Sequence, residues 1–211
     1  MARVAALGRL AQGQWGMVTT RQAADTGVSR MQLSRMAAVG VLERLAQGIY
    51  RMTGAPEHEH EEILTAWLAV SDGTVATRTA NPVVVAGVAA ARLHGIGDLW
   101  VDRIDLITRE RRSSRNPRVR LQTRVLPAGE VTLVDGAPLL TPMRTIADLV
   151  DRWTDLSLVA DVLRDAHEKG LADLRELARY LAPLAERDGF APGDGAAFAE
   201  QLAVDAGLVL G

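Results

Sequence analysis

The chain has 211 residues, 48% apolar and 24% charged, an ordinary globular composition with room for one large domain or two small ones. It contains no cysteine, which excludes disulfides and thiolate metal sites. No apolar run reaches the roughly 18 residues of a membrane span, and the amino terminus lacks the apolar core of a signal peptide. We therefore expect a cytoplasmic protein with no membrane partner.

The charge of the chain is unevenly distributed. The net charge is −2, but residues 1–52 carry +5 and residues 53–211 carry −7. Lys169 is the only lysine, so the basic side chains are almost all arginine. Arginine has a planar fork that binds phosphate or guanine through two hydrogen bonds. The asymmetry predicts an amino-terminal part that binds a polyanion, joined to a second part with another task.

The first elements of the chain are two short helices. An apolar face predicts a helix over residues 4–11, and a turn with two glycines follows over residues 12–17. Thr19 and Gln22 have the spacing of a capping box, which opens a second helix of about seven residues. We expect this helix to stop at Gly27.

A third helix and a hairpin follow in the stretch from Ser29 to Met52. Ser29 is a suitable N-cap with Gln32 three residues on, and an apolar stripe follows at helical spacing. Gly40 suits the left-handed position after a helix end. Strands over residues 42–45 and 49–52, joined by three residues that include a glycine, predict a hairpin. Helix, helix, turn, helix and hairpin is the layout of a winged helix-turn-helix.

The polar side of this third helix predicts DNA binding. In such a module the third helix enters the major groove, and the wing lies beside the backbone. We expect Arg30, Gln32, Ser34 and Arg35 to face the bases, and Ser29 to meet a phosphate. The wing and its flank would add Arg44, Gln47 and Arg51. The alternative is a small three-helix module with a solvated arginine face.

A second domain is expected over residues 55–211, after a DNA-binding domain at residues 1–54. Pro56 and the acids after it predict a helix that runs to about Val70, and residues 74–78 predict a short strand. We expect a buried, apolar helix over residues 83–97, with His94 in a structural role at its end. His58 and His60 are two residues apart, which is unsuitable spacing for a helical metal site, so we expect no metal.

The remaining elements predict a mixed sheet followed by helices. Strands are expected over residues 103–108, 119–125 and 131–134, and the strands should end at the glycine and proline of residues 136–138. Thr141 then caps a helix that has Pro142 at its first position. The last expected helices span residues 157–169, 171–185 and 196–207. The predicted fold class is α/β (α+β): a winged helix-turn-helix, then a mixed α/β domain with a helical carboxyl-terminal part.

A second basic patch lies within residues 103–124, which carry a net charge of +6. Its members are Arg109, Arg111, Arg112, Arg115, Arg118 and Arg120. This patch has three candidate partners: nucleic acid, an acidic region of a partner protein, or the phosphates of a nucleotide. The alternative is a solvated, flexible hairpin loop.

Five stretches of the chain resemble the AbiEi family of antitoxins from type IV toxin–antitoxin systems. They are GVSRMQLSRMAAVGVLERLAQGIYRM, GVAAARLHGIG, RIDLIT, RERRSSR and PLLTPMRTIADLVDR, and the resemblance covers roughly residues 19–170. It implies an amino-terminal domain that represses its own operon at operator DNA. It also implies a second domain that neutralises a cognate nucleotidyltransferase-like toxin and contributes to operator binding.

One motif of this resemblance lies at the start of a helix. Thr141, Arg144, Thr145 and Asp148 match it. A threonine cap and an ion pair between Arg144 and Asp148, four residues apart, would explain these residues structurally.

No recognisable catalytic motif is present. The sequence lacks a P-loop, the protein-kinase motifs and a nucleophile elbow. The leading interpretation is a DNA-binding antitoxin without a cofactor. One alternative is an enzyme-like antitoxin that transfers a phosphoryl group to a toxin serine, which would need ATP and Mg²⁺, with the loop at residues 109–124 around the phosphates. Another alternative is a transcriptional regulator whose second domain senses a ligand.

Overall fold

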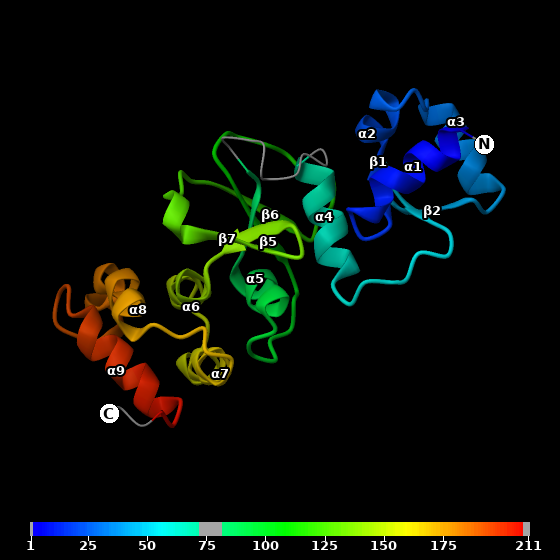
Figure 1. Cartoon of the computed structure of the whole chain (residues 1–211). Coiled ribbons are helices and arrows are strands. Elements are labelled where there is room, and N and C mark those ends of the chain that lie inside the picture. Colours follow the sequence, from blue (N-terminus) through cyan, green and yellow to red (C-terminus); the bar gives the residue numbers. More distant parts are fainter. Residues whose placement is uncertain (1, 72–81, 209–211) are drawn as a thin grey trace.

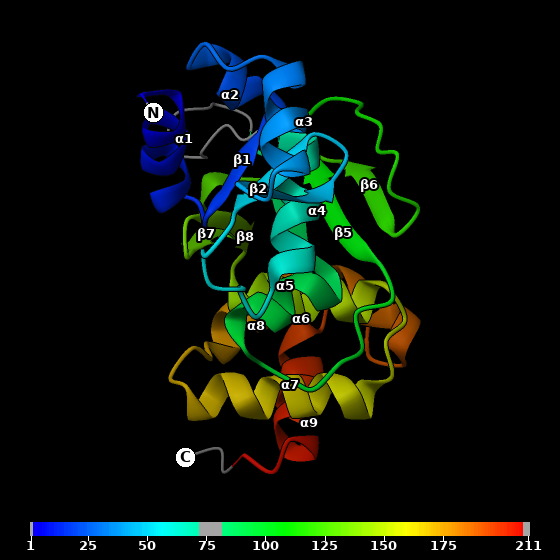
Figure 2. The same cartoon turned by 90° about the vertical axis from the view of Figure 1, so that its right-hand side faces the viewer.

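A computed structural model describes residues 2–71 and 82–208. An amino-terminal lobe lies at one end, a five-stranded sheet lies in the middle, and helices form the other end (Figures 1 and 2). Helices α1 and α9 therefore lie at opposite ends of the molecule (Figure 1). The strand predicted over residues 74–78 lies outside the described residues.

The amino-terminal lobe is a winged helix-turn-helix, as predicted. Its elements are α1 (Ala2–Gln12), β1 (Met17–Thr19), α2 (Thr20–Asp25), α3 (Arg30–Ala38), β2 (Leu42–Ala46) and β3 (Ile49–Met52). The strands form an antiparallel sheet in the order β1-β3-β2. Strand β1 was not predicted, because three residues are too few to show an alternating pattern.

Both predicted capping boxes are confirmed. The Thr19 hydroxyl accepts a hydrogen bond from the Gln22 backbone N–H at 3.1 Å, and Gln22 Oε1 accepts one from the Thr19 N–H at 2.9 Å. Ser29 and Gln32 make the same pair of bonds at the start of α3. These bonds satisfy N–H groups that have no partner within the helix, so each start is fixed locally.

The central sheet has the strand order β6-β5-β4-β8-β7. Its strands are β4 (Val84–Ala86), β5 (Ile104–Thr108), β6 (Val119–Thr123), β7 (Val131–Val134) and β8 (Ala137–Leu140). Strand β4 is parallel to β8, and β5 is parallel to β6, whereas the other neighbouring pairs are antiparallel. Helices α4 (Glu61–Ser71) and α5 (Gly87–His94) pack against this sheet through one shared apolar core.

Three predictions in this region are wrong. Residues 83–97 do not form one helix, because the run of valines is β4 and the helix begins only at Gly87. β-Branched residues favour strands, and β4 is buried between β5 and β8. The strands do not end at residues 136–138, because Asp135 and Gly136 form a turn into β8. Helix α4 begins at Glu61 and not at Pro56.

His94 connects α5 to the sheet. Its Nε2 lies 2.8 Å from the backbone oxygen of Leu140 at the end of β8. Burial lowers the pKa of His94, which favours a neutral ring that donates Nε2–H to this oxygen. The role is structural, as predicted, but the partner belongs to β8 and not to the last turn of α5.

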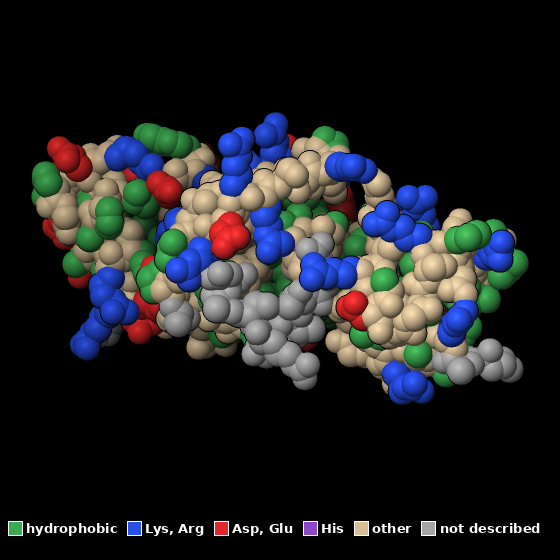
Figure 3. All heavy atoms as spheres, turned by 90° about the horizontal axis from the view of Figure 1, so that it is seen from above, with side chains coloured by type: hydrophobic (Ala, Val, Ile, Leu, Met, Phe, Trp, Pro, Cys, Tyr) green, Lys and Arg blue, Asp and Glu red, His purple; other side chains and the backbone are tan. Residues whose placement is uncertain are grey.

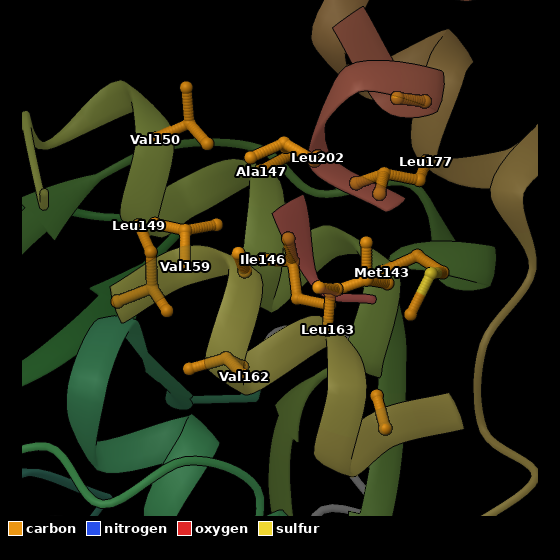
Figure 4. Packing of buried hydrophobic residues seen from close by; sticks show 14 of the residues in the cluster. Met143, Ile146, Ala147, Leu149, Val150, Val159, Val162, Leu163, Leu177 and Leu202 are labelled. Carbon is orange, nitrogen blue, oxygen red and sulfur yellow. The ribbon is translucent and has the colours of Figure 1, made fainter. Parts of the chain in front are cut away.

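The carboxyl-terminal helices form a separate apolar core. The helices are α6 (Pro142–Asp151), α7 (Leu156–Glu168), α8 (Leu174–Leu181) and α9 (Gly195–Asp205), with 3-10 turns at Ala182–Leu184 and Glu186–Asp188. Figure 4 shows side chains of α6 and α7 meeting Leu177 of α8 and Leu202 of α9. The strongly apolar side of α6 supplies the centre of this core.

One core crosses from the amino-terminal lobe to the central sheet. Met17 and Ile49 of the winged helix-turn-helix belong to the same buried cluster as Trp67 of α4 and Leu106 of β5. Trp15 also contacts the Trp67 ring edge-on, with 6.2 Å between ring centroids. The predicted boundary after residue 54 remains a prediction, and the packing is continuous across it.

Gly87 is a site where we expect a single added methyl group to destabilise the protein. Its φ is +57°, and a Cβ would lie 2.9 Å from Asp105 Oδ2 and 3.3 Å from Arg152 Nε. We expect Gly87→Ala to lower the free energy of unfolding by about 2 kcal/mol or more, measured by urea denaturation. The control is Gly8→Ala within α1, where a Cβ meets nothing within 4 Å. That change should raise the free energy of unfolding by about 0.5–1 kcal/mol. Equal effects of the two substitutions would contradict the steric clash expected at Gly87.

Candidate nucleic-acid interface

Helix α3 presents one polar face to solvent. Leu33 is fully buried against the lobe, whereas Arg30, Ser34 and Arg35 are exposed. Met31 lies on the same exposed face, with 63% of its surface accessible. Arg30 and Ser34 are four residues apart, as are Met31 and Arg35, so they form two neighbouring rows. This face of α3 is thus open to solvent, and its contact with DNA stays a prediction.

The capping box limits what Ser29 and Gln32 can offer to DNA. Gln32 Oε1 accepts the Ser29 N–H at 2.9 Å, and Ser29 Oγ accepts the Gln32 N–H at 3.3 Å. A glutamine that reads adenine in bidentate fashion uses both its amide oxygen and its amide nitrogen. While the box is intact, Gln32 Oε1 therefore keeps only one lone pair for a base, and the orientation of the amide is set by the box. Ser29 can still donate its hydroxyl hydrogen to a phosphate.

The wing is the hairpin of β2 and β3. Arg44 is exposed, and its Nε donates to the backbone oxygen of Ala46 at 3.4 Å across a break in the strand register. Gln47 is exposed at the turn, next to Gly48 at φ +81°. These two side chains lie where the sequence analysis placed them, on the outer edge of the lobe.

Arg51 does not belong to this surface, which corrects one prediction. Its side chain is only 7% exposed. Nη1 donates to Glu61 at 2.5 Å, while Nη2 donates to Glu43 at 2.6 Å and to Glu57 at 3.2 Å. These carboxylates raise the pKa of Arg51, with Glu43 the largest cause. The guanidinium connects the wing to the linker and to α4, so it is not free to meet a phosphate.

Arginines of the second basic patch are largely engaged within the protein. Arg112 Nη1 donates to the Val70 backbone oxygen at 2.6 Å. Arg118 bonds Glu62 and the backbone oxygens of Val101 and Asp102. Arg120 forms a bidentate pair with Asp105 through bonds of 2.5 and 3.0 Å. These three residues therefore have structural partners.

The other members of the patch reach solvent. Arg109, Arg111 and Arg115 are exposed on the segment between β5 and β6. Figure 3 shows basic side chains spread over one face of the molecule, from the central sheet to the amino-terminal lobe, with few acidic side chains among them. The exposed arginines between β5 and β6 are thus additional candidates for contact with a polyanion.

The motif at the start of α6 has partners other than those expected. Thr141 occupies the N-cap position but makes no capping bond, and its buried hydroxyl has no partner among the described residues. Arg144 pairs with Glu130 at 3.2 Å and not with Asp148. Asp148 instead pairs with Arg152, one turn further along α6, at 2.7 Å. Thr145 is fully buried and donates to the Leu140 backbone oxygen at 3.2 Å.

Sequence reasoning did not single out Arg124 and Arg152, which join Asp105 and Asp148 in a buried ionic cluster. Their positions on β5, β6 and α6 are far apart in the chain, so no local spacing could have revealed the cluster.

Within residues 2–71 and 82–208, His58, His60 and the acids near them do not form a group able to hold a metal ion. The two histidine rings lie 5.7 Å apart, and burial lowers the pKa of His60. None of the described helices combines the length and the apolar character needed to cross a bilayer.

Comparison with known families gives a match for the amino-terminal lobe. Residues 6–53 match the AbiEi_4 family, whose model is described as a transcriptional regulator, AbiEi antitoxin. The matched segment runs from within α1 to the residue after β3 and includes the whole of α3. A comparison with curated proteins found no match. The lobe that carries the candidate DNA-binding face is thus similar to a domain of antitoxins that regulate transcription.

The buried position of Arg51 predicts that it stabilises the fold. We expect Arg51→Met to lower the free energy of unfolding by about 1–3 kcal/mol, because Glu43, Glu57 and Glu61 would then cluster without a cation. Urea denaturation at neutral pH measures this change. Arg44→Met, at an exposed position of the same hairpin, should change stability by less than about 0.5 kcal/mol. An unchanged urea midpoint for Arg51→Met would refute the structural role.

Proposed function

We propose that this chain as a whole is an AbiEi antitoxin of a type IV toxin–antitoxin system. In this proposal it represses its own operon through the amino-terminal lobe and neutralises a nucleotidyltransferase-like toxin. The observation that carries the proposal is the exposed arginine face of α3, within the segment similar to AbiEi transcriptional regulators. An α-helix with a free polar face fits the major groove, where base edges are distinguishable.

The spacing on α3 suits contact with successive base pairs. Arg30 and Arg35 are five residues apart, which is about 7.5 Å along a helix axis, roughly two base steps. Each can bind guanine through its planar fork. Met31 and Ser34 lie between them on the same face, and Met31 offers an apolar contact for a thymine methyl group.

The wing and the start of α3 supply contacts that do not read sequence. Arg44 and Gln47 flank α3 on the hairpin, where they would lie against the DNA backbone. Ser29 and the free N–H groups of the first turn of α3 offer a further phosphate contact. Arg51 is left out of this set, because it is buried and paired.

Toxin neutralisation is assigned to residues 55–211. This part has a net charge of −7, opposite in sign to that of the amino-terminal lobe, and its resemblance to AbiEi antitoxins supports the assignment. The predicted partner is the product of a neighbouring gene. In this arrangement one chain links the control of the operon to control of the toxin.

Operator binding tests the role of α3. The probe is the DNA upstream of the protein's own gene, and the assay is a gel-shift titration at fixed salt. We expect the Arg30→Ala, Arg35→Ala double variant to bind at least about tenfold more weakly, because each bidentate base contact contributes about 1–3 kcal/mol. Discrimination between operator and unrelated DNA should fall as well.

A matched control distinguishes the loss of the two α3 arginines from a general loss of positive charge. Arg175 and Arg179 are exposed on α8, at the other end of the molecule, so their double alanine variant removes the same charge. That variant should bind the operator like the wild type. Equal binding by both double variants and the wild type would overturn the proposed role of α3.

Co-expression with the neighbouring toxin tests the second half of the proposal. We expect the Arg30→Ala, Arg35→Ala variant, expressed from an unrelated promoter, to protect cells as well as the wild type does. The reason is that the substitutions lie on the exposed face of α3, outside residues 55–211. Loss of protection at equal protein level would contradict this division of tasks, and so would the absence of any toxic neighbour.

A further inference from the structure

A buried cluster of three arginines and two aspartates lies where β5, β6 and α6 meet. Asp105 is on β5, Arg120 is on β6 and Arg124 follows it, while Asp148 and Arg152 belong to the α6 region. The side chains of both aspartates are almost inaccessible, with 5% exposure for Asp105 and 1% for Asp148. We call this set the Asp105–Asp148 cluster.

Arg152 joins the two halves of the cluster. Its Nε donates to Asp148 Oδ2 at 2.7 Å, and its Nη1 donates to Asp105 Oδ1 at 3.0 Å. Arg120 adds its bidentate pair on Asp105. Arg124 Nη2 and the Gly87 N–H donate to Asp148 at 3.4 and 3.1 Å. Every carboxylate oxygen of the cluster therefore accepts at least one hydrogen bond.

The cluster has more donors than the carboxylates use. Among the described residues, Arg124 Nε and Arg152 Nη2 are buried N–H groups without a hydrogen-bond partner. Both belong to guanidinium groups that bond the carboxylate of Asp148, Arg124 through Nη2 and Arg152 through Nε. A buried, unpaired donor is costly, and more so on a charged group.

The charge balance of the cluster also indicates a missing negative group. Three guanidinium groups surround two carboxylates, which leaves one surplus positive charge. The neighbouring pair of Arg144 and Glu130 is neutral and does not offset it. Burial, and secondly the proximity of Arg144, lower the pKa of Arg124, as expected for a cation with too little negative charge around it.

We propose that the Asp105–Asp148 cluster is a binding site for a phosphate group, held by Arg124 Nε and Arg152 Nη2. A phosphate oxyanion supplies both the missing acceptors and the missing negative charge, and arginine is the side chain best suited to it. A metal cation would not fit, because the carboxylate oxygens are already engaged and the surplus charge is positive. The phosphate can be inorganic or the terminal group of a nucleotide.

The cluster is open on one side. The Arg124 side chain is 28% exposed and that of Arg120 is 44% exposed, whereas Arg152 is 11% exposed. Arg120 lies on β6, an edge strand of the sheet, and Arg124 directly follows that strand, so the partly exposed side of the cluster is the side of these two arginines. A phosphate would approach along this edge. This site is distinct from α3, and its failure would leave the proposed repression of the operon unaffected.

Thermal unfolding of the full chain tests the proposal. The melting temperature is compared in potassium phosphate and potassium chloride at equal pH and ionic strength. A ligand at a hundred times its Kd should raise the melting temperature by roughly 5 °C or more for a chain of this size. Arg124→Gln should lose this phosphate-dependent increase. Arg111→Gln removes the same charge from an exposed position between β5 and β6 and should keep it.

A second measurement uses only the wild-type chain, so it does not depend on how the variant folds. Phosphate should shift the NMR resonances of the Arg124 Nε–H and the Gly87 N–H in a saturable way, because Nε–H would donate to the phosphate directly and the Gly87 N–H donates to Asp148, which Arg124 Nη2 also contacts. Equal melting temperatures in the two salts, together with unshifted resonances, would overturn the proposal. An equal phosphate effect in Arg124→Gln and Arg111→Gln would do the same.

Two further ligands, ATP without metal and adenosine, are tested in the same melting experiment. They distinguish a nucleotide from a free phosphate group as the natural ligand. A larger effect of ATP than of inorganic phosphate, lost in Arg124→Gln, would assign the site to a nucleotide. Equal effects of ATP and phosphate, both lost in that variant, would assign it to a free phosphate group. ATP binding that persists in Arg124→Gln, without a phosphate effect, would place nucleotide binding elsewhere and refute this site.

Discussion

The contact between Arg51 and its three carboxylates is the interaction on which the arrangement of the two lobes depends. The guanidinium comes from the wing, and Glu43, Glu57 and Glu61 come from the wing, the linker and α4. Beside it, Met17 and Ile49 complete an apolar core shared with α4 and the central sheet. Ion pairs fix the direction of approach and apolar burial supplies most of the energy. The winged lobe is thereby seated on the second lobe, with α3 facing outward.

Arginine has two tasks in this chain, and sequence position alone does not separate them. Because Lys169 is the only lysine, both structural ion pairs and surface charge must come from the same residue type. Arg118 lies in a stretch at least as basic as the one that holds Arg35, and Arg51 lies in the hairpin just after α3, yet their guanidinium groups bind acids and backbone oxygens of the protein. Arg30 and Arg35 lie on the exposed face of α3. Acids and backbone oxygens brought close by the fold therefore decide which arginines are engaged within the chain.

The sequence was most informative where structure is determined by neighbouring residues. The capping boxes at Thr19 and Ser29, the glycine after α3 and the hairpin of the wing depend on contacts within a few positions, so spacing revealed them. Strand β4 was missed because its pairing partners, β5 and β8, are distant in the chain. Strand β8 pairs with its neighbour β7 and was missed because the glycine and proline of residues 136–138 are typical of a strand end. The candidate DNA-binding face could be predicted from one helix, whereas the partners of Arg51 and Asp148 come from separate elements. Only the folded chain brings those groups together.

The apolar core that crosses between the lobes has a thermodynamic consequence. A lobe that opened alone would expose Met17 and Ile49 on one side and the matching surface around Trp67 on the other. Partial unfolding is therefore unfavourable, and the two lobes are expected to melt in a single cooperative transition. Proteolytic turnover would then remove the whole molecule at once, so that under the proposed function the release of the toxin and the resumption of transcription would coincide.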